Sequence, residues 1–205
     1  MKISYAIPVC NEHSELNRLI SSIINLMEGT YEIVVQCDSG NTTREVYEVL
    51  ERYGDRIKVV EFPLNRDFSS FKNNLKANCS GDWIIQIDAD EELTEIFFKN
   101  IYSVLNSNEG VEVFLLPRIN TVENLTEEHI NKWGWRVDER GWVNFPDWQT
   151  RILKNSSNIH WRNKVHEVLS GHTQYSFFPQ NPEWCIFHHK SLDRQEKQNE
   201  LYSKL

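Results

Sequence analysis

Short apolar segments alternate with amphipathic segments along the first half of the chain. The predicted strands, which are apolar and rich in β-branched residues, are 3–9, 32–37, 57–62, 83–87 and 111–117. The predicted helices, in which apolar residues recur at helical spacing, are 16–27, 43–53, 71–79 and 94–105. Strands that are apolar almost throughout and alternate with helices are typical of a mostly parallel sheet covered on both faces. The pattern therefore predicts an α/β, Rossmann-like fold for this half.

The character of the sequence changes after Pro117. Six of the seven tryptophans and six of the seven histidines lie beyond residue 128. The sequence shows no repeat, low-complexity tract or Ser/Gly-rich linker between the two parts. We therefore expect one domain over 1–205, with a ligand-binding half to residue 117, a smaller Trp- and His-rich half over 118–190, and a C-terminal helix over 191–205.

The composition narrows the class of protein. A chain of 205 residues, 40% of them hydrophobic, can bury one good core. The formal net charge of −8 and the lack of a Lys/Arg block argue against a nucleic-acid partner. We expect no transmembrane segment, since no apolar stretch has the required length, and leave contact with a membrane surface open. The four scattered cysteines form no CxxC pair, which favours a cytoplasmic location.

Two closely spaced acids follow the predicted strand over 83–87. This strand runs directly into DADEE, so that Asp88 and Asp90 stand where the chain leaves the sheet. Carboxylates in that position can bind Mg²⁺ or Mn²⁺, with phosphate oxygens filling the remaining coordination positions. The alternative is a solvated loop whose acids favour the start of the following helix. This pattern by itself leaves both interpretations open.

Three segments in sequence order resemble family 2 glycosyltransferases with the GT-A fold: IPVCNEHSELNRLISSI, EIVVQCDSGNTTREV and DFSSFKNNLKANCSGDWIIQIDADEEL. The resemblance covers about residues 3 to 117 and implies a nucleotide-sugar-binding half. It implies that the first loop and the acid after the second strand hold the base and ribose, and that the DxD element meets ribose and metal. On this sequence the implied base and ribose residues are Pro8, Asn11, Glu12 and Asp38, and the implied ribose and metal residues are Asp88 and Asp90.

The segments DFSSFKNN, PDWQTRIL and VHEVL are similar to one branch of that family, the lipopolysaccharide-core glucosyltransferase-like proteins. This narrower resemblance implies that Lys72 and Asn73 belong to the donor site. Lys72 stands where we expect Arg in that branch. Its compact ammonium group takes the place of a planar guanidinium with several N–H donors. The tryptophans of 132–142 are interpreted either as an acceptor pocket that stacks on sugar faces or as a second small core.

The catalytic base has to be argued separately, because the Glu-Asp dipeptide of many family 2 enzymes is absent from this sequence. Inverting sugar transfer needs a carboxylate that accepts the proton of the acceptor hydroxyl. Glu167 in WRNKVHEVLSG is the first candidate, Asp147 in FPDWQTR is the second, and Asp138 is also open. The resemblance further implies a metal ligand from the second half, for which His189 and His166 qualify. An imidazole ligand would favour Mn²⁺ over Mg²⁺.

The residues and the resemblance together predict a metal-dependent, inverting glycosyltransferase. We expect it to move a hexose from a UDP-sugar to a hydroxyl of a glycan or glycolipid acceptor. A nucleotidyltransferase is one alternative, although the loop CNEHSE lacks the Gly-rich, basic phosphate loop expected there. A non-catalytic carbohydrate-binding relative is the other. The absent Glu-Asp dipeptide favours it, and the intact DAD argues against it.

Overall fold

A computed structural model describes residues 1–202 of the chain, apart from the side chains of residues 198 and 200–202. The strands are β1 (Ile3–Val9), β2 (Tyr31–Asp38), β3 (Lys58–Phe62), β4 (Trp83–Gln86), β5 (Glu91–Glu92), β6 (Val113–Glu123), β7 (Val143–Lys154), β8 (His160–Arg162), β9 (Val168–Ser170), β10 (Tyr175–Phe177) and β11 (Ile186–Ser191). The α-helices are α1 (His13–Leu26), α2 (Arg44–Tyr53), α3 (Phe68–Ala77), α4 (Glu95–Asn106), α5 (Glu127–Trp133) and α6 (Leu192–Tyr202). Each helix predicted in the first half is present within a few residues of its expected bounds. The last three residues of the predicted C-terminal helix lie outside the described range.

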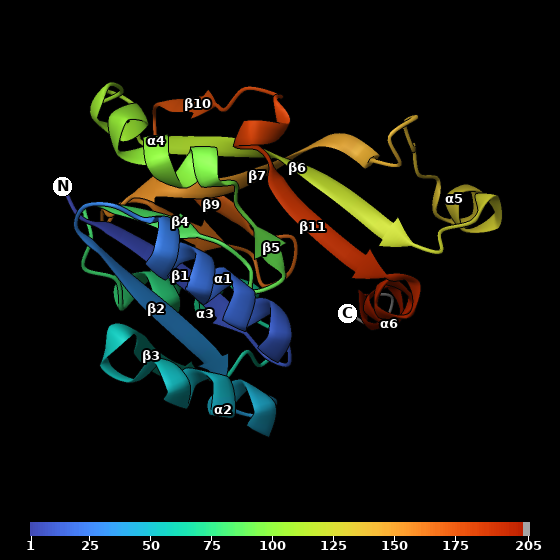
Figure 1. Ribbon diagram of the computed structural model, residues 1–205, viewed down its shortest axis with the longest axis horizontal. Helices are drawn as coiled ribbons and strands as arrows, with labels where there is room; N and C mark the ends of the chain where they lie inside the picture. The colour runs from blue at the N-terminus through green and yellow to red at the C-terminus, as the bar shows by residue number, and fades with distance from the viewer. Residues whose placement is uncertain (203–205) are drawn as a thin grey trace.

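One nine-stranded sheet runs through both halves of the chain (Figure 1). Its order is β3-β2-β1-β4-β7-β6-β11-β5, and β10 also pairs with β6. The first four of these strands are parallel, and β7 joins β4 in antiparallel orientation. The strand β6 continues through Pro117 to Glu123, so the boundary predicted at residue 117 lies inside a strand. The two predicted halves are therefore joined by the hydrogen bonds of a single sheet.

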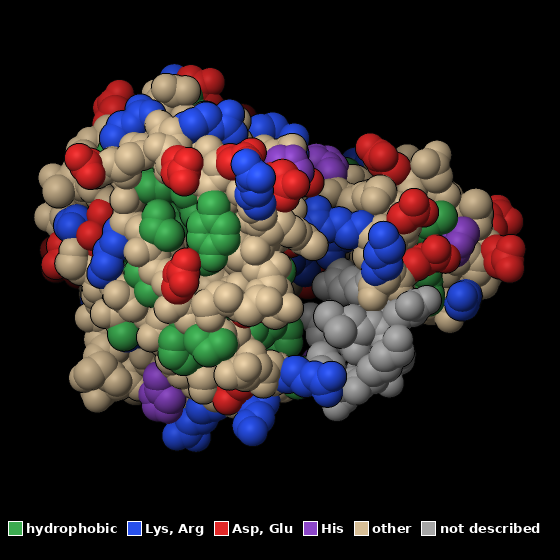
Figure 2. Space-filling view, turned by 90° about the horizontal axis from the view of Figure 1, so that it is seen from below, with side chains coloured by type: hydrophobic (Ala, Val, Ile, Leu, Met, Phe, Trp, Pro, Cys, Tyr) green, Lys and Arg blue, Asp and Glu red, His purple; other side chains and the backbone are tan. Residues whose placement is uncertain are grey.

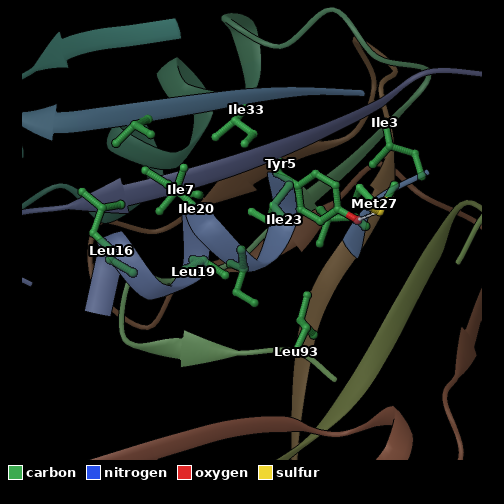
Figure 3. Close-up of a cluster of buried hydrophobic side chains, with 14 of the residues drawn as sticks. Ile3, Tyr5, Ile7, Leu16, Leu19, Ile20, Ile23, Met27, Ile33 and Leu93 are labelled. Carbon is green, nitrogen blue, oxygen red and sulfur yellow. Dashed lines mark hydrogen bonds between the residues drawn. The ribbon is translucent and has the colours of Figure 1, made fainter. Parts of the chain in front are cut away.

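Hydrophobic cores lie on both faces of this sheet. Tyr5 and Ile7 of β1 belong to the larger core, which α1, α2 and α4 cover, whereas Ala6 belongs to the smaller core with Leu75 of α3. Successive strand residues point to opposite faces, which is why a strand covered on both sides is apolar throughout. In Figure 3 the helix α1 places Leu16, Leu19, Ile20 and Ile23 in the larger core, next to β1.

The parallel strands β1, β2 and β4 end at one edge of the sheet, where ligands of open α/β sheets bind. The strands β6 and β7 extend beyond this body to a lobe that carries α5, with α6 nearby (Figure 1). His129 Nε2 of α5 lies 3.8 Å from Glu196 Oε1 of α6. None of the helices within residues 1–202 is long and apolar enough to cross a membrane.

Candidate active site

Two adjoining cavities lie on one side of the molecule, the larger at the carboxyl ends of β1, β2 and β4 and the smaller against β6, β7 and β11. The larger, of about 530 Å³, is lined among others by Pro8, Asn11, Glu12, Asp38, Lys72, Asp88, Asp90, Gln149, Arg151 and Glu167. The smaller, of about 300 Å³, is lined among others by Asn120, Thr121, Trp135, Asn144, Asp147, Gln195 and Asn199. Arg118, His188 and Lys190 line both cavities and so form the wall between them. Figure 2 shows a hollow between the body of the molecule and the lobe on its right, with Lys and Arg side chains inside it.

The residues predicted to hold base and ribose all reach the larger cavity. They are Pro8, Asn11, Glu12 and Asp38. Glu12 Oε2 accepts the backbone N–H groups of Cys10 and Asn11, each at 2.9 Å, and so fixes the loop after β1. Asp38 Oδ1 accepts the N–H of Leu64 at 3.0 Å, which ties the loop after β3 to the end of β2. These carboxylates thus shape the loops of the cavity that they line.

Asp88 is held by a buried arginine. Arg151 Nη2 lies 2.5 Å from Asp88 Oδ2 and 2.6 Å from Glu91 Oε1, and Glu91 is completely buried. Burial alone would raise the pKa of Asp88, but the charge of Arg151, followed by that of Lys72, holds this pKa below its usual value. Neither Arg151 nor Glu91 is among the site residues predicted from the sequence. Nothing in the local sequence indicates that Arg151, sixty-three residues from Asp88, would reach it.

Asp90 faces His188 at the wall between the cavities. His188 Nε2 lies 3.2 Å from Asp90 Oδ2, and His188 Nδ1 lies 2.8 Å from Asn120 Oδ1. Burial alone would raise the pKa of Asp90, but the hydrogen bond to His188 and the nearby positive charges of Arg194 and Lys190 lower it. Asp90 is therefore ionised at neutral pH and already has cationic partners.

The histidine at this wall is His188 and not the predicted His189. Neighbouring residues of β11 point to opposite faces, and the exposed His189 hydrogen-bonds Thr121 instead. His166, the other predicted ligand, is exposed, has a φ of 55° and lines neither cavity. The structure thus brings His188 rather than His189 to Asp90, because the spacing FHHK does not show which of its two rings turns inward. A metal-binding role for a histidine of the second half stays a prediction.

Glu167 lies in the larger cavity and not in the smaller one. Its carboxylate pairs with Lys72, whose Nζ also lies 4.5 Å from the centre of the Trp161 ring. Asn73, which we predicted in the same site, does not line the cavity. Its side chain exchanges two hydrogen bonds with the backbone of Trp161, at 2.9 and 2.8 Å. Asn73 therefore holds β8 against α3, while Lys72 and Glu167 face the cavity.

Asp147 lies in the smaller cavity. Its Oδ2 accepts hydrogen bonds from Arg118 Nε at 2.9 Å, from Arg118 Nη2 at 2.7 Å and from Asn120 Nδ2 at 2.9 Å. Burial alone would raise the pKa of Asp147, but the charge of Arg118 and these hydrogen bonds lower it. The third candidate, Asp138, pairs with Arg140 at 2.7 Å and lines neither cavity.

One tryptophan of the predicted acceptor segment reaches a cavity. Trp135 lines the smaller cavity and packs against Trp133, with ring centres 4.6 Å apart. Trp142 packs against Phe145, with ring centres 4.9 Å apart, and the guanidinium carbon of Arg140 lies 3.6 Å from the centre of its ring. The segment therefore forms clusters of half-buried aromatic side chains with one ring at a cavity, and its part in acceptor binding stays a prediction.

Comparison with known proteins identifies the family. The model described as "Glycosyl transferase family 2" matches residues 4–179. The chain is 26% identical over 110 residues to the poly(ribitol-phosphate) beta-N-acetylglucosaminyltransferase TarP of Staphylococcus aureus, covering 52% of this chain and 34% of that protein. It is 32% identical over 113 residues to a dolichol-phosphate mannosyltransferase of Pyrococcus furiosus, covering 53% and 32%. The crystal structure of S. aureus TarS 1-349 in complex with UDP has a TM-score of 0.64 at 13% identity, covering 92% of this chain and 60% of that chain.

The chain belongs to glycosyl transferase family 2. The structural likeness to TarS confirms the predicted GT-A fold. The aligned segments span about a third of the length of the two curated relatives. The narrower resemblance to the lipopolysaccharide-core branch stays a prediction, since these relatives carry other names.

Proposed function

We propose that the protein is a metal-dependent, inverting glycosyltransferase that moves a hexose from a UDP-sugar to a hydroxyl of a glycan or glycolipid. The observation that carries this proposal is the pair of adjoining cavities, which share a wall of Arg118, His188 and Lys190. Transfer between two substrates needs two binding sites that meet at the reacting atoms. The larger cavity is the donor site in this proposal and the smaller is the acceptor site.

The donor assignment rests on the loops at the ends of β1, β2 and β4. Asp38 lies in the larger cavity, where a carboxylate can accept the imide N–H of uracil. The solved complex of the structural neighbour TarS contains UDP, which supports the same class of ligand for this cavity. A nucleotide-sugar donor also fits the predicted cytoplasmic location.

Two carboxylates and one imidazole are available as ligands for a divalent metal ion. Asp90 and His188 are in contact, and Asp88 lies in the same cavity. Among residues 1–202, no group of three or more His, Cys, Asp and Glu side chains is arranged to hold a metal ion. Phosphate oxygens of the donor would therefore have to complete the coordination, and the ligand chemistry of Asp90 and His188 suits Mn²⁺. A bound ion would stabilise the charge that develops on the leaving diphosphate.

The geometry favours Asp147 over Glu167 as the base. Asp147 lines the cavity assigned to the acceptor, whereas Glu167 lines the donor cavity and pairs with Lys72. In the proposed step a carboxylate oxygen of Asp147 takes the proton of the acceptor hydroxyl, whose oxygen forms a bond to the anomeric carbon. The bond from that carbon to the diphosphate breaks, and UDP leaves with the electron pair. The lowered pKa keeps Asp147 ionised, although its bonds to Arg118 reduce its basicity.

A ligand panel followed by a transfer assay tests this proposal. We expect UDP-sugars with Mn²⁺ to raise the melting temperature more than GDP-, dTDP- or CDP-sugars, because ligands that bind the native state stabilise it. Asp147→Asn should then lower kcat by roughly two to four orders of magnitude with donor affinity kept, the usual effect of removing a general base. Glu167→Gln is the matched control, since it removes the same charge from the other cavity. If only the Glu167 variant lost turnover, Glu167 would be the base and Asp147 would not.

A non-catalytic carbohydrate-binding relative is the second candidate. The pairing of both candidate bases with cations favours it, because an ion-paired carboxylate is a weaker base. UDP-sugar binding without transfer to any glycan acceptor, and without hydrolysis of the donor, would support this second function.

A further inference from the structure

Arg194, near the start of α6, joins three carboxylates at the edge of the larger cavity. Its Nη2 lies 2.9 Å from Glu12 Oε1 and 3.4 Å from Asp90 Oδ2, and its Nη1 lies 3.3 Å from Glu15 Oε1. The first acid belongs to the loop after β1, the second to the loop after β4 and the third to α1. A single guanidinium therefore connects the C-terminal helix to both loops of the proposed donor site.

This arrangement has a clear electrostatic reason. The three carboxylates would repel one another at close range, and a guanidinium presents several N–H donors that can bind them together. Both Arg194 and Asp90 are partly shielded from solvent, with 31% and 15% of their side-chain surfaces exposed. Their attraction is therefore screened less than that of a fully exposed pair.

The same oxygen of Asp90 is the one that faces His188. A divalent ion bound by Asp90 and His188 would place two positive charges next to the guanidinium of Arg194. Like charges at such a separation repel, and one carboxylate oxygen has room for few cationic partners. Arg194 and the ion therefore cannot both stay in close contact with this oxygen.

We propose that Arg194 is a positioning residue that occupies the metal carboxylate in the unloaded protein and competes with the divalent cation for it. Cation binding then releases Arg194 from Asp90 and so loosens the hold of α6 on the loop after β4 that carries Asp90. This inference rests on the proposed function through one point only, the assignment of a metal ion to Asp90.

Calorimetric titration of Mn²⁺ alone into the full chain tests the competition. We expect Arg194→Gln to bind Mn²⁺ about two- to fivefold more tightly than the parent, which corresponds to the upper part of the range measured for exposed ion pairs. Arg194→Lys should lie between the two, because it keeps the charge but loses the fork. Arg18→Gln is the matched control. It removes the same charge from a surface pair with Glu92, 3.2 Å apart, and should leave the affinity at the parental value.

Hydrogen exchange of the amides in residues 192–197 gives a second readout. In the parent, Mn²⁺ should speed exchange in this part of α6, whereas in Arg194→Gln exchange should already be fast without the ion. A purely structural role for Arg194 would speed exchange without raising the affinity for Mn²⁺.

The outcomes separate this inference from the proposed function. Mn²⁺ binding by the parent with equal or weaker binding by Arg194→Gln would overturn the competition and leave the metal assignment intact. Mn²⁺ binding by none of the proteins, either alone or with UDP present, would overturn both. Tighter binding by Arg194→Gln, together with parental binding by Arg18→Gln, supports the inference.

Discussion

Arg151 offers the sharpest test of how the acids of the site are held. Its guanidinium contacts Asp88 at 2.5 Å and Glu91 at 2.6 Å, and only 3% of the residue is exposed. Arg151→Met keeps a long apolar side chain but removes the charge. We expect the variant to lose stability, because Glu91 is completely buried and its charge depends on partners inside the protein.

The size of this loss follows from the contacts that remain. Removing one partner of a buried ion pair costs roughly 3–5 kcal/mol, since it leaves a buried charge without compensation. Glu91 keeps a second partner, Arg118, whose Nη1 lies 2.9 Å from its Oε1. We therefore expect a loss at the low end of that range, about 3 kcal/mol. For a domain of this size each kcal/mol lowers the melting temperature by about 2–4 °C, so the expected drop is about 6–12 °C.

Urea unfolding at neutral pH, followed by tryptophan fluorescence, measures this loss. Arg44→Met is the matched control, because it removes an arginine from a helical surface pair with Glu48 in which 88% of the arginine side chain is exposed. Its unfolding midpoint should stay close to that of the parent. The reasoning is refuted if Arg151→Met loses no more stability than Arg44→Met does.

Three further predictions concern single acids. Asp90→Asn should abolish Mn²⁺-supported UDP binding and keep the fold. If the variant and the parent bound UDP equally well with Mn²⁺ in a thermal-shift titration, the assignment of a metal site to Asp90 would be wrong. Asp38→Ala should weaken UDP-sugar binding in the same titration. If it weakened GDP-sugar binding and left UDP-sugar binding unchanged, the assignment of Asp38 to uracil would be wrong. Burial alone would raise the pKa of Glu32, but hydrogen bonds from Lys2 and two serines lower it from 4.5 to about 2. Its contribution to stability is therefore full above the unfolded pKa and lost as pH falls towards about 2. Glu32→Gln should reduce the difference between urea midpoints at about pH 6 and about pH 3.

The sequence predicts most of the first half because local patterns decide it. Apolar strands covered on both faces need side chains such as Tyr5, Ala6 and Ile7, and amphipathic helices show the spacing of Leu16 and Leu19. The carboxyl ends of parallel strands meet at one edge, so the order of strands and helices along the chain is enough to place the acids after β2 and β4 there. The resemblance to family 2 glycosyltransferases adds their expected roles.

The second half is less predictable because its functional residues depend on long-range pairing. The choice between His188 and His189 depends on which face of β11 turns towards Asp90, and a one-residue change of register would reverse it. Which cavity Asp147 lines and which Glu167 lines depends on how β7 and the β8–β9 hairpin pack against the rest of the fold. The sequence shows no periodic signal for either packing.

The sequence by itself thus determined the α/β order of the first half and the edge at which its acids gather, because strand and helix periodicity are local properties of the chain. Only the tertiary structure decided which cations meet those acids. Arg151 reaches Asp88 across 63 residues of sequence and Arg194 reaches Glu12 across 182, and both contacts exist because distant segments pack at one end of the sheet. Such pairs leave no local pattern, since a guanidinium can bind any carboxylate that the fold brings within its reach.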